Sequence, residues 1–156
     1  ELVPEKIPVL LDGEKVVSRE VDIAGGKYKI TAVSMGNPHC IVLVDNVDKF
    51  DINTYGPKFE NDPLFPERVN TEFIKIIDEK TIKMRVWERG SGETWACGTG
   101  ACAAAVAACE NGFCKKNTDI TVKLVGGDLV IRYTDDGTVF MTGNAVIAFE
   151  GKVVIE

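Results

Sequence analysis

The chain has 156 residues and a formal net charge of −6 at pH 7, and 45% of its residues are hydrophobic. This length and composition fit one soluble globular domain with a sizeable core. The negative charge argues against nucleic-acid partners and anionic membranes, and no apolar run is long enough to span a bilayer.

The elements expected along the chain are mostly strands, with two helices. Asp51 is a candidate N-cap for a short helix that runs to about Phe59, although Gly56-Pro57 weakens that prediction. Stretches rich in Val, Ile and Thr between turn signals predict strands. These are Lys15–Ile23, Lys27–Val33, Cys40–Val44, Glu72–Ile77, Ile82–Trp87, Ile120–Leu124, Leu129–Tyr133, Val139–Thr142 and Val146–Glu150.

The second expected helix spans about Gly100 to Asn111 and has no polar face. A helix that is apolar all round is usually buried inside a larger structure. Asn111-Gly112 is a plausible C-terminal stop for it. The sequence therefore predicts an α+β fold in which an antiparallel or mixed β-sheet wraps around a buried central helix and leaves the N-terminus of that helix open.

Residues 97–100, Cys-Gly-Thr-Gly, place one thiol where this buried helix begins. Free backbone N–H groups and the helix dipole favour negative charge there, which predicts a lowered pKa for Cys97. The same N–H groups can hold a carboxylate or a phosphate. The alternative from local sequence is a tight turn with a buried, inert thiol.

The cysteine count of five is odd, and no pair has C-x-x-C spacing. No secretory signal is visible, so we expect a cytoplasmic protein with free thiols, without a disulfide framework. Because His39 is the only histidine, we expect no metal site. Cys102 and Cys109 read as small core residues.

Three further places carry candidate site residues. The loop 34–39 presents Asn37 and His39 between two strands, and either is also explained as a structural residue. Asn70 precedes a strand and is either a loop cap or an amide ligand. Glu88-Arg89 ends a strand, where Arg89 can grip a carboxylate and Glu88 can accept an ammonium, unless the pair is a solvated surface ion pair.

Three segments together resemble one family. GNPH at Gly36–His39, RVNTEF at Arg68–Phe73 and ERGSGETWACGTGACA at Glu88–Ala103 are similar to the signature of diaminopimelate epimerases. The resemblance covers residues 1–156 as a single domain, equivalent to the C-terminal half of an enzyme built from two similar halves. No counterpart of the N-terminal half, which carries the other catalytic cysteine, is found in the chain.

The resemblance implies an isomerase that interconverts LL- and meso-diaminopimelate, in lysine and peptidoglycan precursor biosynthesis, without pyridoxal phosphate, metal or any other cofactor. One thiolate removes the α-proton and a thiol on the opposite face returns one. Cys97 would be one of these groups, and this half would be inactive alone. The other implied roles are N–H contacts to the α-carboxylate from Gly98 and Thr99, distal contacts from Asn37, Asn70 and Arg89, an ammonium contact from Glu88, and pKa tuning by His39 and Glu88.

The implied partners are diaminopimelate and the N-terminal half, with a homodimer left open and neither nucleic acid nor a membrane expected. Two alternatives remain at this point. The chain could belong to a related cofactor-independent racemase, for proline or histidine for example. Alternatively, Cys97 and His39 could form a hydrolase site, which requires a hydrogen bond between the two side chains.

Overall fold

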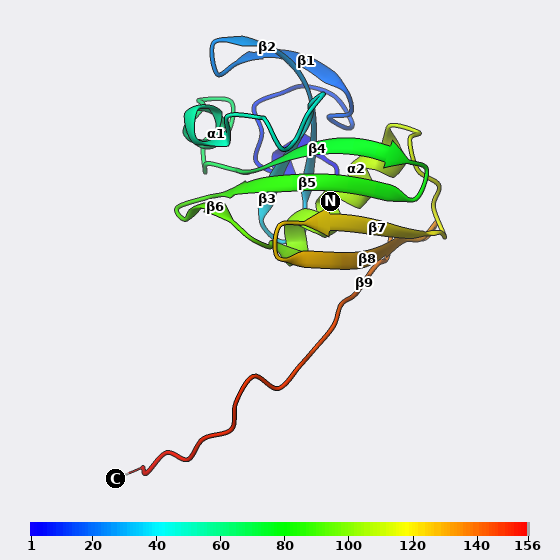
Figure 1. The fold of residues 1–156 in the computed structure, drawn as a ribbon. Coiled ribbons are helices and arrows are strands. Elements are labelled where there is room, and N and C mark those ends of the chain that lie inside the picture. Colours follow the sequence, from blue (N-terminus) through cyan, green and yellow to red (C-terminus); the bar gives the residue numbers. More distant parts are fainter. Residues whose placement is uncertain (156) are drawn as a thin grey trace.

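The computed structural model describes residues 1–155 and contains one curved, mixed β-sheet with two α-helices (Figure 1). The predicted α+β class is confirmed. None of the helices in these residues is long and apolar enough to cross a membrane. Along the chain the elements are a short 3₁₀ turn η1 (Pro4–Lys6), strands β1 (Arg19–Ile23), β2 (Gly26–Ser34) and β3 (Pro38–Leu43), helix α1 (Ile52–Glu60), strands β4 (Asn70–Asp78), β5 (Thr81–Glu88) and β6 (Gly92–Thr94), helix α2 (Gly98–Glu110), and strands β7 (Asp119–Leu124), β8 (Gly127–Tyr133) and β9 (Val139–Thr142).

The strands lie in the order β1-β2-β3-β4-β5-β7-β8-β9, and β6 pairs with β5 beside this path. Two neighbouring pairs are parallel, β3 with β4 and β5 with β7, while the others are antiparallel. Helix α2 contacts strands from both parts of the sheet, including β2 and β9. The sheet therefore curves around α2, as the apolar sequence of this helix predicts.

Alternating residues of the central strands serve two cores, one on each face of the sheet. Ile74 of β4 packs on the α2 side, whereas Phe73 packs on the α1 side. On β3, Ile41 faces α2 and Cys40 faces α1 in the same way. Since His39 is two residues before Ile41 and Glu72 is two before Ile74, both belong to the α2 face, close to where that helix begins.

Helix α1 begins where the sequence predicts, because the Asp51 carboxylate accepts the Thr54 N–H at 3.2 Å. The helix includes Pro57 and ends at Glu60. Gly56 is required by a close approach: a Cβ there would lie 2.3 Å from an indole carbon of Trp87.

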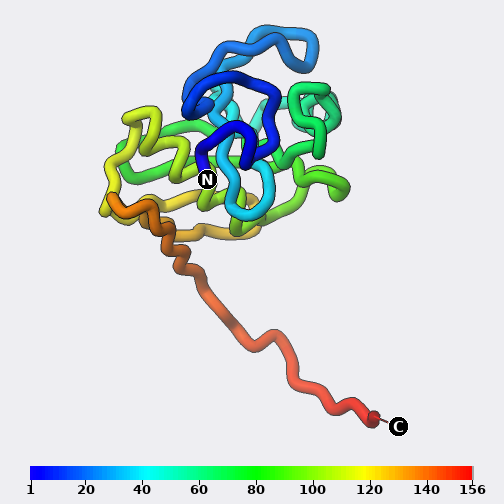
Figure 2. The backbone as a smooth tube through the Cα atoms, turned by 180° about the vertical axis from the view of Figure 1, so that it is seen from behind, coloured from blue at the N-terminus to red at the C-terminus, as the bar shows by residue number. Residues whose placement is uncertain are grey.

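The predicted strand Lys15–Ile23 is too long, since β1 starts at Arg19. Ser18 has a φ of 48°, which is outside the extended region and interrupts the strand just before Arg19. The strand expected at Val146–Glu150 is wrong. Residues 143–155 have no regular structure and run away from the sheet as the orange-to-red end of the chain (Figures 1 and 2). They meet no neighbouring strand there, so their backbone has nothing to pair with.

Candidate active site

The thiol of Cys97 lies at the start of α2, as the sequence predicts. Cys97 is the N-cap, with an extended backbone, and its Sγ accepts the Gly100 N–H at 3.3 Å. The Thr99 hydroxyl lies 3.5 Å from the same sulfur. The residue is only 8% exposed. Two donors are therefore placed to stabilise a thiolate in a largely buried position.

The pKa of the Cys97 thiol is raised above its ordinary value, so the expectation of a lowered pKa is wrong. Burial is the largest cause, because it disfavours the charged thiolate. Hydrogen bonds from Thr99 and Gly100 lower the pKa, but the nearby carboxylates of Glu72 and Glu88 raise it further. At neutral pH the protonated thiol, which can give a proton, is the favoured form.

Small residues at the start of α2 let neighbouring groups come close. A Cβ at Gly100 would lie 2.6 Å from Oε1 of Glu72, and one at Gly98 would lie 3.1 Å from Sδ of Met141. Thr99 is exposed. The helix start is accessible at Thr99, whereas Met141 of β9 lies close over Gly98, so the expectation of an open N-terminus holds only in part.

His39, which is fully buried, lies between two acceptor oxygens. Its Nδ1 is 2.7 Å from Oε1 of Glu72, and its Nε2 is 3.0 Å from Oδ1 of Asn37. Asn37 in turn donates from Nδ2 to the Thr99 hydroxyl at 3.4 Å. A chain of hydrogen bonds thus runs from the buried carboxylate of Glu72 to the residue beside the Cys97 sulfur. Both ring nitrogens of His39 are occupied and neither bonds to Cys97, which argues against a Cys–His hydrolase pair.

Glu72 is missing from the site residues that sequence reasoning selected. The signal available was a carboxylate directly before the apolar pair Phe73-Ile74 in a strand-like segment. Its side chain is fully buried, and Oε2 has no hydrogen-bond partner in the described part of the chain.

Asn70, Glu88 and Arg89 surround the turn between β5 and β6. Asn70 is buried, donates to the Pro38 carbonyl at 2.9 Å and accepts the Arg89 backbone N–H at 2.9 Å. Arg89 also donates from Nη1 to the Glu67 carbonyl, and Glu88 accepts the hydroxyl of Thr94. The Asn70 amide thus joins Pro38, the first residue of β3, to the turn after β5.

The other four cysteines lie in the two cores or near the far end of α2. All five are free, as predicted. Cys40 is fully buried in the core on the α1 side of the sheet, and burial raises its pKa well above the ordinary value. Cys102 belongs to the core around α2, and Cys109 and Cys114 lie near the other end of that helix. Residues 1–155 hold no group of three His, Cys, Asp or Glu side chains that could bind a metal ion.

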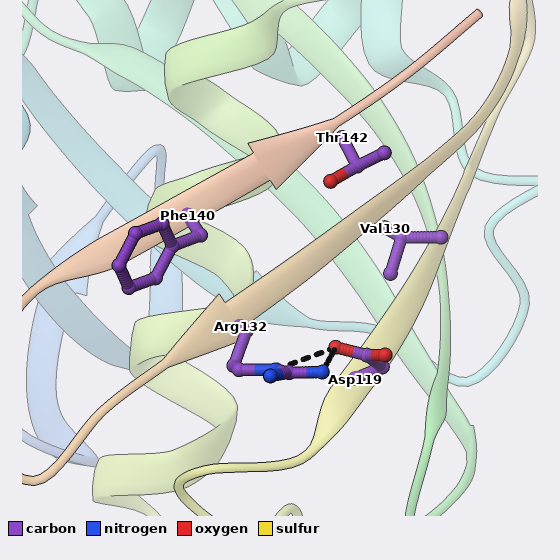
Figure 3. Close-up of a pocket in the computed structure, with 5 residues that line it drawn as sticks. All are labelled: Asp119, Val130, Arg132, Phe140 and Thr142. Carbon is purple, nitrogen blue, oxygen red and sulfur yellow. Dashed lines mark hydrogen bonds and ion pairs between the residues drawn. The ribbon is translucent and has the colours of Figure 1, made fainter.

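A separate hollow of about 400 Å³ lies over β7, β8 and β9 and is lined by Asp119, Val130, Arg132, Phe140 and Thr142 (Figure 3). None of these residues belongs to the cluster around Cys97. The Arg132 guanidinium donates to Asp119 at 2.7 Å, so the cation of this hollow is already paired.

Comparison with known proteins identifies the family. The family model described as diaminopimelate epimerase matches residues 31–148. This chain belongs to the diaminopimelate epimerase family. A diaminopimelate epimerase of Acetivibrio thermocellus is 54% identical over 153 residues, which are 97% of this chain and 54% of that protein. A second family member, from Desulfovibrio desulfuricans, is 49% identical over 162 residues, covering 99% of this chain and 56% of that protein. The chain thus spans about half the length of the curated relatives it matches.

A solved structure described as a probable proline racemase from Agrobacterium radiobacter K84 has a similar fold. Its TM-score is 0.51, with 13% identity over 86% of this chain and 51% of that one. At this identity the likeness concerns the fold alone. It agrees with the mixed sheet and buried helix described for this family member.

Proposed function

We propose that this chain is the half of a cofactor-independent diaminopimelate epimerase that supplies one of two proton-transfer thiols. The observation that carries the proposal is the position of Cys97, whose sulfur caps α2 and takes hydrogen bonds from Gly100 and the adjacent Thr99. Inversion at a carbon needs an acid on one face and a base on the other. Because burial raises the pKa of Cys97, this half favours the acid at neutral pH.

The second thiol would come from the N-terminal half of the complete enzyme. Cys40 is a poor substitute, because it packs on the opposite face of the sheet from Cys97. The chain covers 54% of the Acetivibrio thermocellus relative, which leaves room for another half of similar size. The exposed segment 143–155 supports such a partner, since Val146 and Phe149 are 88% and 87% exposed and would be buried by a second domain.

The substrate would lie over the first turn of α2. The backbone N–H groups of Gly98 and Thr99 would receive the α-carboxylate, where the helix dipole stabilises the negative charge that develops during proton removal. Asn37, Asn70 and Arg89 would hold the distal end of diaminopimelate. Glu88 would contact an ammonium group, and Glu88 and His39 would tune the proton-transfer thiols. No cofactor is required for this chemistry.

The test follows deuterium at Cα of diaminopimelate by NMR in D₂O. The samples are this chain alone and this chain fused to the N-terminal half of the Acetivibrio thermocellus relative. We expect exchange and interconversion of LL- and meso-substrate only in the fusion. Cys97→Ala should abolish turnover, whereas Cys109→Ala, at the other end of the same helix, should not.

Two outcomes would overturn the proposal. Substantial epimerisation by this chain alone would show that a second half is not needed. A folded fusion that exchanges proline or histidine but not diaminopimelate would instead indicate the racemase alternative.

A further inference from the structure

Glu72 of β4 is a buried carboxylate that the proposed proton transfer does not use. It is fully buried, and its Oε1 lies 2.7 Å from Nδ1 of His39. Within residues 1–155, His39 is its one ion-pair partner, and Oε2 has no partner. Burying a carboxylate is costly unless a positive group compensates its charge. We therefore expect the buried carboxylate of Glu72 to have a role in the site that offsets this unfavourable free energy.

Both ring nitrogens of His39 face oxygens that can accept a hydrogen bond, Oε1 of Glu72 and Oδ1 of Asn37. The titratable groups on the same face of the sheet are His39 from β3 and Cys97 from the start of α2, while Cys40 of β3 packs on the other face. Of these groups, His39 alone can carry positive charge. A Cβ at Gly100 would touch the Glu72 carboxylate, so this carboxylate lies directly beside the first turn of α2. The positive end of that helix dipole stabilises negative charge there.

A ring that donates from both nitrogens determines the direction of the next hydrogen bonds. Because Nε2 of His39 carries hydrogen, it donates to Oδ1 of Asn37 at 3.0 Å. The amide nitrogen of Asn37 must therefore point the other way, where it donates to the Thr99 hydroxyl at 3.4 Å. Thr99 accepts that bond and keeps its own hydrogen for the sulfur of Cys97, 3.5 Å away.

We propose that Glu72 is a positioning residue, which acts through His39 to fix the amide of Asn37 with its NH₂ group toward the substrate. This inference rests on the proposed function for the identity of the substrate. A fixed NH₂ donor matches a carboxylate, whereas the opposite orientation would present an oxygen and repel it. Glu72 thus contributes to selection of an acidic substrate without touching it.

Replacement of Glu72 by glutamine should reverse the orientation of the Asn37 amide. The neutral amide can still accept the Nδ1–H of His39, but nothing compensates a buried imidazolium. The ring then keeps hydrogen on Nδ1 alone, and the bare Nε2 needs a donor. Asn37 turns its NH₂ toward His39, and its oxygen faces the substrate.

The first test is ¹⁵N NMR of the imidazole in this chain at pH 7, which gives one set of ring signals because His39 is the only histidine. We expect both ring nitrogens to carry hydrogen in the unaltered chain and Nε2 to be bare in Glu72→Gln. The matched control is Glu60→Gln, which changes another buried carboxylate, bonded to Trp87 and Arg68, and should leave the ring signals unchanged. Far-UV circular dichroism checks that each variant is folded.

A bare Nε2 in the unaltered chain would overturn the proposal, whether or not the variant folds. Retention of the Nε2 hydrogen in a folded Glu72→Gln variant would overturn it as well. The second test measures diaminopimelate kinetics in the fusion enzyme. The loss of a donor to a carboxylate should raise KM at least about tenfold, with a smaller fall in kcat.

The two tests separate this inference from the proposed function. If the unaltered fusion is folded but inactive, the epimerase proposal fails while the ring signals still report on Glu72. If the unaltered fusion is active and Glu72→Gln has the same KM, the epimerase proposal stands and the role of Glu72 is refuted.

Discussion

The close packing of Gly100 on Glu72 can be tested by the addition of a single methyl group at position 100. In Gly100→Ala, the new Cβ would lie 2.6 Å from Oε1 of Glu72 and 3.2 Å from Sγ of Cys97. Compared with an ordinary contact of 3.4 Å, the first distance is too short by 3.4 − 2.6 = 0.8 Å. The carboxylate cannot easily retreat, because it is fully buried and held at 2.7 Å by His39.

The expected change in the free energy of unfolding of Gly100→Ala follows from two opposing effects. Overpacking of this kind costs about 1–3 kcal/mol. Alanine gains up to about 1 kcal/mol over glycine in a helix interior, and less in the first turn. We therefore expect Gly100→Ala to lower the free energy of unfolding by about 1–2 kcal/mol.

Gly98→Ala is the matched control, because it adds the same methyl group to the same turn of α2. Its Cβ would meet Sδ of Met141 at 3.1 Å, and this side chain is flexible and 53% exposed. Its cost should stay within about 0.5 kcal/mol. Both variants are compared with the unaltered chain by urea unfolding, monitored by tryptophan fluorescence. An equal slope m in all three proteins shows that the unfolded state has not changed. Equal stability of the two variants would refute the packing of Gly100 on a fixed Glu72.

Three further predictions concern other parts of the molecule. Gly56→Ala should lower stability by about 3 kcal/mol, because its Cβ would lie within 2.6 Å of three ring atoms of Trp87; an unchanged Tm would contradict this. Thr99→Val removes a donor to the Cys97 thiolate, so the pKa of that thiol should rise further and the pH profile of its alkylation should shift upward. A downward shift, measured by mass spectrometry, would disprove the contact. For Glu110, burial raises the pKa, but hydrogen bonds from two lysines outweigh it and hold the pKa below its ordinary value. The stability that these ion pairs provide is present above about pH 4.5 and is lost as the pH falls through the folded pKa. Glu110→Gln should therefore reduce the loss of unfolding free energy between neutral and acid pH by about 1 kcal/mol. A loss as large as that of the unaltered chain would argue against the ion pairs.

Local sequence was sufficient for most of the secondary structure. Val139–Thr142 was predicted with the bounds of β9, and the apolar run after Cys97 was identified as a buried helix. These predictions succeed because the periodicity of apolar residues and the helix-capping groups act over a few residues. Val146–Glu150 shows the limit, since a strand-like composition does not make a strand without a neighbour to pair with.

The candidate site was also only partly predictable from local sequence. Local sequence was enough to place the thiol, because Cys97 and the small residues after it begin a helix that has no polar face. The ionisation of that thiol depends on the folded chain, since its burial and the nearby carboxylates of Glu72 and Glu88 arise from the packing of other elements against α2. The parallel pairing of β3 with β4 also placed His39 beside Glu72, a contact over 33 residues. A pKa and a long-range contact both depend on what surrounds a group in space, and only the folded chain specifies those surroundings.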